Sequence, residues 1–273
     1  MQGVVDTLDY SRLVGFFTHA TTILVLIPGI GLAAAILDQD KSPFAPRWML
    51  GSLIVLSALW VLGSGIRFVG ATDLPASDVI ASAFMLATLV PGSLLLFGAI
   101  MSTRARPGRN MPALLFVLSF VLNATVGGLS GVFLAHLTTG PTLLGTAFES
   151  AHMHLLLGGA GLSIALAALY HWWPQLIGDA LDERLGSLAA GFVFIGLQLT
   201  FLPQFYLGLR GTLLRLDHTP IGGSNMELVS TLGSWVLALG FWFVLMNLMR
   251  SLRSPGVVEV PTSAGLQLES KEA

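Results

Sequence analysis

Seven long apolar stretches, each separated from the next by a short polar segment, dominate this sequence. A helix needs about 20 apolar residues to cross the roughly 30 Å hydrocarbon core of a bilayer. The stretches have that length, and they place helices at about 13–37, 48–70, 79–102, 112–136, 147–173, 186–208 and 227–249. Since proline, glycine and charge gather between them, the sequence predicts an all-α polytopic membrane protein of seven transmembrane helices.

Composition excludes several other classes of protein. Hydrophobic residues make up 54% of the 273 residues and charged residues 10%, far below the roughly 25% charged content of a soluble domain. A net charge of -2 provides no basic surface for a nucleic-acid partner. Without cysteine, the chain forms neither disulfides nor thiolate metal sites. We expect a single transmembrane domain over residues 1–250 and a polar tail over 251–273.

The basic residues predict the orientation, because positively charged loops stay on the cytoplasmic side. With seven spans, Arg12, Arg67, Arg210 and Arg215 lie at or near one side of the membrane. The other carries Lys41, Arg47, Arg104, Arg106, Arg109, Arg184, Arg250, Arg253 and Lys271. This places the N-terminus outside and the C-terminus in the cytoplasm. The opening MQGVVDTLDY lacks the basic region of a signal peptide. An external N-terminus without a signal peptide is unusual, and it is expected if the chain corresponds to the later part of a longer membrane protein.

Two histidines in AHMHLLLGGAGL, His152 and His154, lie at membrane depth in the fifth predicted helix. Ionisable residues at this depth usually face a site. Two residues of helix turn the side chains about 200° apart, so the imidazoles should point to opposite faces. Each can then bind a separate haem, and the small Gly158, Gly159 and Gly161 beneath them admit a neighbouring helix or a flat ring. The alternative is a pair of histidines hydrogen-bonded between helices.

Four further residues are candidates for a site at or near the membrane depth of His152 and His154. His19 lies at the depth of His152 in the first predicted helix, either as a ligand or as a structural histidine. Arg67 lies near the outer end of the second helix, and Arg210 and Arg215 follow the sixth. A guanidinium group matches a carboxylate, so these arginines can hold haem propionates. Ordinary interfacial arginine is the alternative.

A series of motifs then gives a family resemblance. The motifs are VGGLSGVFLAH, AHMHLLLGGAGL, YHWWPQLIG, FIGLQLTFLPQFYLGLRG and STLGSW. In this order and spacing they resemble the second half of subunit I of the haem–copper oxidases, the cytochrome c oxidase type, from its sixth to its twelfth helix. The resemblance implies that His152 binds a high-spin haem and His154 a low-spin haem. It also implies that the other low-spin ligand lies in the half that this chain lacks.

The same resemblance shows where the chain departs from the family. After His19 the family's Pro-Glu-Val-Tyr is replaced, and Ser64 and Gly65 stand where two copper histidines are expected. The lost proton-pathway lysine, magnesium-site pair and first propionate arginine fall on Leu95, Leu144, Gly145 and Leu214, whereas Arg215 keeps the second arginine. One histidine is too few to hold copper. We therefore expect haem but no copper.

Three functions remain open from the sequence. The leading hypothesis is a haem-binding, oxidase-like subunit of a respiratory electron-transfer complex in the bacterial inner membrane, without copper-dependent oxygen reduction or proton pumping. Its expected partners are a membrane protein equivalent to the missing first half of subunit I, other respiratory subunits and a cytochrome c. The second hypothesis is an active terminal oxidase whose atypical site is completed by a partner chain. The third is a haem-free assembly scaffold.

Overall fold

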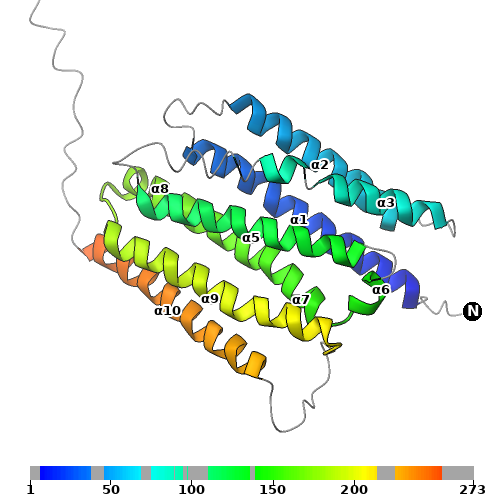
Figure 1. The fold of residues 1–273 in the computed structure, drawn as a ribbon. Helices are drawn as coiled ribbons and strands as arrows, with labels where there is room; N and C mark the ends of the chain where they lie inside the picture. The colour runs from blue at the N-terminus through cyan, green and yellow to red at the C-terminus, as the bar shows by residue number, and fades with distance from the viewer. Residues whose placement is uncertain are drawn as a thin grey trace, which may run out of the picture.

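The computed structural model describes residues 7–37, 46–68, 75–88, 90–94, 97, 110–135, 139–213 and 225–253. Within these ranges the chain is helical apart from short turns and one isolated bridge between Thr146 and Leu213. The elements are α1 (Thr7–Leu37), α2 (Pro46–Phe68), α3 (Pro75–Ala87), α5 (Met111–Ala135), α6 (Gly140–Leu143), α7 (Ala147–Met153), η1 (His154–Ala160), α8 (Gly161–Ile177), α9 (Glu183–Leu209) and α10 (Asn225–Arg253). Figure 1 shows a bundle of long helices lying side by side.

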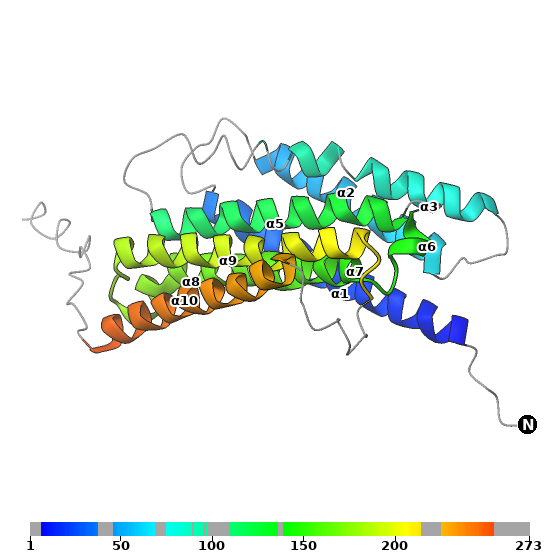
Figure 2. The ribbon, with the colours of Figure 1, turned by 60° about the horizontal axis from the view of Figure 1, so that its bottom comes forward.

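One long helix with a π-helical turn in its middle lies near the centre of the bundle. It consists of α7, η1 and α8, which follow one another with no residue between them. We call it the π-interrupted helix, because the π-helical η1 separates its two α-helical parts. It packs against α5, α9 and α1. Beyond α9 lies α10, and beyond α1 lie α2 and α3, as Figures 1 and 2 show. The centre is therefore covered by protein on several sides.

Four helices in the described part of the chain are long and apolar enough to cross a membrane. They are Met111–Leu134, Ala147–Ile177, Glu183–Leu209 and Asn225–Arg253. Each overlaps one of the seven predicted spans. Shorter apolar segments, Leu24–Leu37 and Ile54–Gly63, lie in α1 and α2. The all-α membrane fold is therefore confirmed, whereas seven spans and the orientation stay predictions.

The third predicted span, 79–102, differs most from the structure. Helix α3 begins at Pro75 and ends at Ala87, and residues 90–94 form a further helical turn. The break lies four residues before Pro91, whose ring lacks an N–H donor and clashes with a helical carbonyl at that distance. Residues 95, 96 and 98–109 lie outside the described part. At the other end of the chain, α10 continues to Arg253, past the predicted start of the tail.

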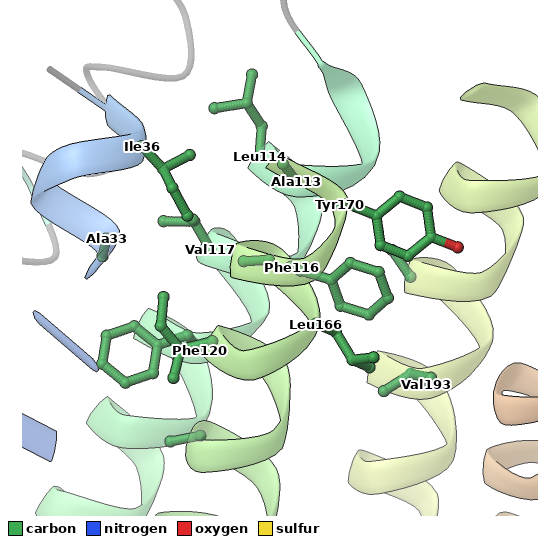
Figure 3. Packing of buried hydrophobic residues seen from close by; sticks show 14 of the residues in the cluster. Ala33, Ile36, Ala113, Leu114, Phe116, Val117, Phe120, Leu166, Tyr170 and Val193 are labelled. Atoms are coloured by element: carbon green, nitrogen blue, oxygen red, sulfur yellow. The ribbon is translucent and has the colours of Figure 1, made fainter. Parts of the chain in front are cut away.

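Packing is tight at the centre and open toward the outside. The rings of Phe116 in α5 and Tyr170 in α8 lie 5.4 Å apart, among the buried residues that Figure 3 shows. On α10, only 17% of the apolar window is buried, and Trp235 is 68% exposed. Large apolar side chains in such numbers on an outer helix suit contact with lipid or with another membrane protein.

Glycines allow α9 and α10 to approach very closely. A Cβ atom on Gly196 of α9 would meet the main chain of Leu237, and one on Gly233 of α10 would meet the main chain of Thr200. Small residues at helix contacts are the usual means of association in lipid, where apolar surface alone gives no preference for protein. These two helices therefore form one closely packed unit.

Candidate functional site

The helix that carries the two histidines changes its winding at His154. Residues Ala147–Met153 are α-helical, His154–Ala160 are π-helical, and α-helix resumes at Gly161. Single π-helical turns inside α-helices are rare and frequently occur at functional sites. The apolar pattern of the sequence did not predict this turn. The adjacent Gly158 and Gly159 are a signal for it, because glycine tolerates irregular backbone more readily than other residues.

His152 is buried against α5, with 6% of its surface exposed. Its Nδ1 lies 2.8 Å from the carbonyl oxygen of Gly127 and 3.1 Å from the Oγ of Ser130. The Ser130 hydroxyl itself donates to the same carbonyl at 2.7 Å. Since a carbonyl only accepts, Nδ1 carries the proton, and in the neutral ring the lone pair lies on Nε2. This arrangement is typical of histidines that bind a metal through Nε2.

A glycine provides the space for this imidazole. A Cβ atom on Gly131 would lie 2.9 Å from Cε1 of His152, closer than an ordinary contact. Gly127, Ser130 and Gly131 were not among the predicted site residues. Their signal in the sequence is VGGLSGVFLAH, one of the motifs that carry the family resemblance.

His154 lies in different surroundings, exposed beside α9. Its Nδ1 is 2.8 Å from the carbonyl oxygen of Ser150 and 3.2 Å from the hydroxyl of the same residue. The ring stacks on Phe201, with centroids 5.1 Å apart and planes 18° apart. A Cβ atom on the exposed Gly158, four residues further along, would meet nothing within 4 Å. The imidazole is thus fixed in one plane beside an open strip of the protein surface.

The two imidazoles therefore contact different helices, as their spacing predicted. His152 lies against α5 and His154 against Phe201 of α9. The glycines beneath them divide in the same way. Gly159 and Gly161 face Asn123 and Val25, whereas Gly158 is open. Such an arrangement suits two separate flat cofactors and excludes one metal ion bound by both histidines.

The remaining predicted residues are only partly placed. Arg210 is exposed and ends α9, with its N–H bonded to the carbonyl of Tyr206. Gly65 is half-buried on α2 and faces open space. The backbone of His19, Ser64 and Arg67 lies in α1 and α2, but their side chains are outside the described part, as are Leu95, Leu214 and Arg215 altogether.

A turn precedes α7 at the magnesium-site positions of the family. Gly145 has a φ of 75° in this turn, and its N–H donates to the carboxylate of Glu149 at 2.6 Å. Glu149 therefore holds the turn at the start of the helix. Among the side chains that the structure describes, no three histidines or carboxylates are grouped so that they could hold a metal ion. That finding does not extend to His19, whose side chain is outside the described part.

Known proteins share this sequence pattern along almost its whole length. Residues 1–250 match the family described as Cytochrome C and Quinol oxidase polypeptide I. The chain is 31% identical over 268 residues to the probable cytochrome c oxidase subunit 1-beta of Nocardia farcinica, covering 95% of this chain and 45% of that protein. It is 26% identical over 274 residues to cytochrome c oxidase subunit 1 of Bacillus subtilis, covering 97% of this chain and 43% of that protein.

A quinol oxidase is also among the relatives. The chain is 26% identical over 249 residues to quinol oxidase subunit 1 of Bacillus subtilis, covering 89% of this chain and 38% of that protein. The chain thus spans less than half the length of these curated relatives. The family binds haem, and its members are subunits of respiratory oxidases in bacterial membranes. This chain is an integral membrane protein and belongs to the haem–copper oxidase subunit I family.

Proposed function

We propose that this chain is a haem-binding, oxidase-like subunit of a respiratory electron-transfer complex, and that it has lost copper-dependent oxygen reduction and proton pumping. The observation that carries the proposal is the shared geometry of His152 and His154. In both, Nδ1 lies 2.8 Å from a main-chain carbonyl oxygen, so Nδ1 carries the proton and the lone pair that can coordinate iron is on Nε2. Haem bound in this way supplies one-electron transfer.

The chain's own residues orient each imidazole for that role. Gly127 and Ser130 hold the ring of His152, and Gly131 leaves the space that the ring needs. Phe201 fixes the plane of His154, and the exposed Gly158 leaves open space nearby. We further propose that Arg210, Arg215 and Arg67 contact haem propionates, since guanidinium groups pair with carboxylates through two parallel hydrogen bonds.

The exposure of His154 supports a partner for this chain. A haem bound there would take a further ligand from outside residues 1–273, and the chain spans less than half of the relatives that it matches. We propose that it corresponds to the sixth to twelfth helices of subunit I, with seven spans and an outside N-terminus. The partner is then a membrane protein equivalent to the first half, together with other respiratory subunits and a cytochrome c.

The proposed loss of copper rests on residue chemistry. Of the three copper ligands that the resemblance implies, only His19 is a histidine, because Ser64 and Gly65 occupy the other two positions. The hydroxyl of Ser64 and the single hydrogen of the Gly65 side chain cannot replace two imidazole ligands of copper. The alternative is an active terminal oxidase whose missing ligands come from the partner. A haem-free scaffold is a further alternative, and the paired Nδ1 geometry gives no reason for it.

Metal and haem analysis of the purified native complex tests these functions against one another. Haem without copper supports the proposal. Stoichiometric copper that disappears in a His19→Ala variant supports the active oxidase, and the absence of both supports the scaffold. In the haem-containing case, His154→Ala should abolish the low-spin bis-histidine spectrum and leave the His152 haem in place. An unchanged spectrum in the assembled complex would contradict the assignment of His154.

We propose that His19 closes the other side of the His152 haem, since the resemblance implies that it lies there; the alternative is an empty pocket in which His19 is hydrogen-bonded to a water or to Thr22. Its neighbour Thr22 is buried and donates its hydroxyl proton to the carbonyl of Thr18. Carbon monoxide added to the reduced complex shows whether His19 binds. A prompt, full spectral shift means an open site. No shift in the wild type, together with a shift in His19→Ala, means that His19 is a ligand.

A further inference from the structure

A chain of polar side chains crosses the middle of the bundle, deeper than the two histidines. The amide of Gln198 donates to Asn123 at 2.7 Å, and the amide of Asn123 donates to Ser119 at 3.2 Å. The hydroxyls of Ser119 and Ser163 are 2.8 Å apart, and Ser163 donates to the carbonyl of Gly159 at 2.6 Å. These contacts, which we call the polar chain, connect α9 and α5 with the π-interrupted helix.

All the hydrogen bonds of the polar chain run from donor to acceptor in the same direction, because each hydroxyl has only one proton. A hydroxyl group has a single proton to donate. Ser163 gives its proton to the carbonyl of Gly159, so in its contact with Ser119 it must accept. Every donor therefore points toward Gly159, and the polar chain ends on the main chain of η1. Because it begins with two amides and ends on a carbonyl, it is unsuited to carrying protons across the membrane.

The polar chain lies at the depth where polar groups are most costly. Asn123 and Ser163 are 0% exposed and Ser119 is 2% exposed. Asn123 lies in the middle of α5, and Ser163 lies in the middle of the π-interrupted helix. The bilayer centre offers no water, so polar side chains there must find partners in the protein. The bonds between these helices are therefore specific contacts that lipid cannot replace.

The polar chain contacts the π-helical turn at Gly159. Where the winding changes, the hydrogen-bond register shifts, and a serine hydroxyl can add a donor to a main-chain carbonyl there. Ser163 provides such a donor at Gly159, near the end of η1. Asn123 also packs on this turn, because a Cβ atom on Gly159 would lie 3.2 Å from its Cγ. The polar chain thus contacts the turn both by a hydrogen bond and by side-chain packing.

The form of η1 determines where the histidines point. One residue of an α-helix corresponds to a rotation of about 100°, so loss of the extra residue in the π-turn rotates one half of the helix against the other by about that angle. The half after the turn is held by Tyr170, which packs on Phe116, and the half before it by Phe148, which packs on Phe205. Such a rotation would change the direction of His152 relative to Tyr170, and it would act on His154 at the start of the turn.

We propose that the polar chain is a positioning device, which keeps η1 in its π-form and thereby sets the directions of His152 and His154. Gln198, Asn123, Ser119 and Ser163 act through the helix and are positioning residues. The effect on haem rests on the proposed function, whereas the hold on η1 does not. The two parts of the proposal therefore have separate measurements.

The hold on η1 is tested by amide hydrogen exchange of residues 155–163 in the assembled complex. Ser163→Ala and Ser119→Ala should accelerate exchange about three- to twentyfold, the range that single hydrogen bonds between membrane helices produce. Gln198→Leu, at the half-buried end, tests the same link by a milder change. The control is Ser251→Ala, which removes a buried acceptor of Trp173 far from η1. Unchanged exchange in the three variants overturns the proposal.

The effect on the histidines is tested by electron paramagnetic resonance of the low-spin haem, whose g-values depend on the orientation of the axial imidazoles. We expect shifted g-values in Ser163→Ala, a return toward the wild type in Ser163→Thr, which keeps the hydroxyl, and no shift in Ser251→Ala. Faster exchange with unchanged g-values overturns the positioning role. A wild-type complex without haem would instead refute the proposed function, and the exchange comparison would still decide whether the polar chain holds η1.

Discussion

Replacement of Gly131 by alanine should disturb His152, although it adds only one methyl group. The new Cβ atom would lie 2.9 Å from Cε1 of the imidazole, whereas ordinary contacts begin at 3.4 Å. To restore an ordinary contact, the ring and the main chain of α5 must move apart by about 3.4 − 2.9 = 0.5 Å. His152 is buried and hydrogen-bonded to the carbonyl of Gly127, so this movement weakens that bond. A buried polar group that loses its partner costs about 1–3 kcal/mol.

Gly128→Ala is the matched control, because a Cβ atom there meets nothing within 4 Å. Both substitutions raise the helix propensity of α5 by about 1 kcal/mol. The two variants should therefore differ by the cost at His152, about 2 kcal/mol, which corresponds to roughly a 30-fold difference in an equilibrium constant.

Haem capture by excess apomyoglobin measures this difference in the purified complex. Gly131→Ala should release the His152 haem faster than the wild type, and Gly128→Ala should not. The iron–imidazole stretching frequency in resonance Raman spectra should shift only in Gly131→Ala, since the hydrogen bond at Nδ1 tunes the basicity of the ligand. Equal behaviour of the two variants would show that His152 is not held against Gly131 as described.

Two further predictions concern α9. Phe201→Leu removes the ring stacked on His154, worth about 0.5–1.5 kcal/mol, and should broaden the low-spin haem signal without loss of the His152 haem; an unaltered signal would show that the stacking does not orient His154. Gly196→Ala forces a methyl group against the main chain of Leu237 and should destabilise the complex by about 1–3 kcal/mol in thermal unfolding, whereas Gly191→Ala, which faces open space, should not; equal melting temperatures would contradict the close α9–α10 contact.

The sequence alone determined the helical membrane fold and pointed to His152 and His154 as the central candidate pair. Lipid cannot satisfy main-chain polar groups, so apolar stretches of sufficient length must become helices whatever their neighbours are. This is why four of the predicted spans overlap the long helices that the structure describes. The two-residue spacing of His152 and His154 likewise fixed their divergence, because it depends only on the turn of one helix.

Only the tertiary structure decided what surrounds these histidines. The partners of His152, Gly127 and Ser130, come from another helix, and Phe201, beside His154, comes from a third. Such contacts depend on how helices distant in sequence pack together, and an apolar pattern is compatible with many packings. The π-helical turn is of the same kind. Its end accepts a hydrogen bond from Ser163 and is packed by Asn123 from α5, and the local sequence does not specify that neighbour.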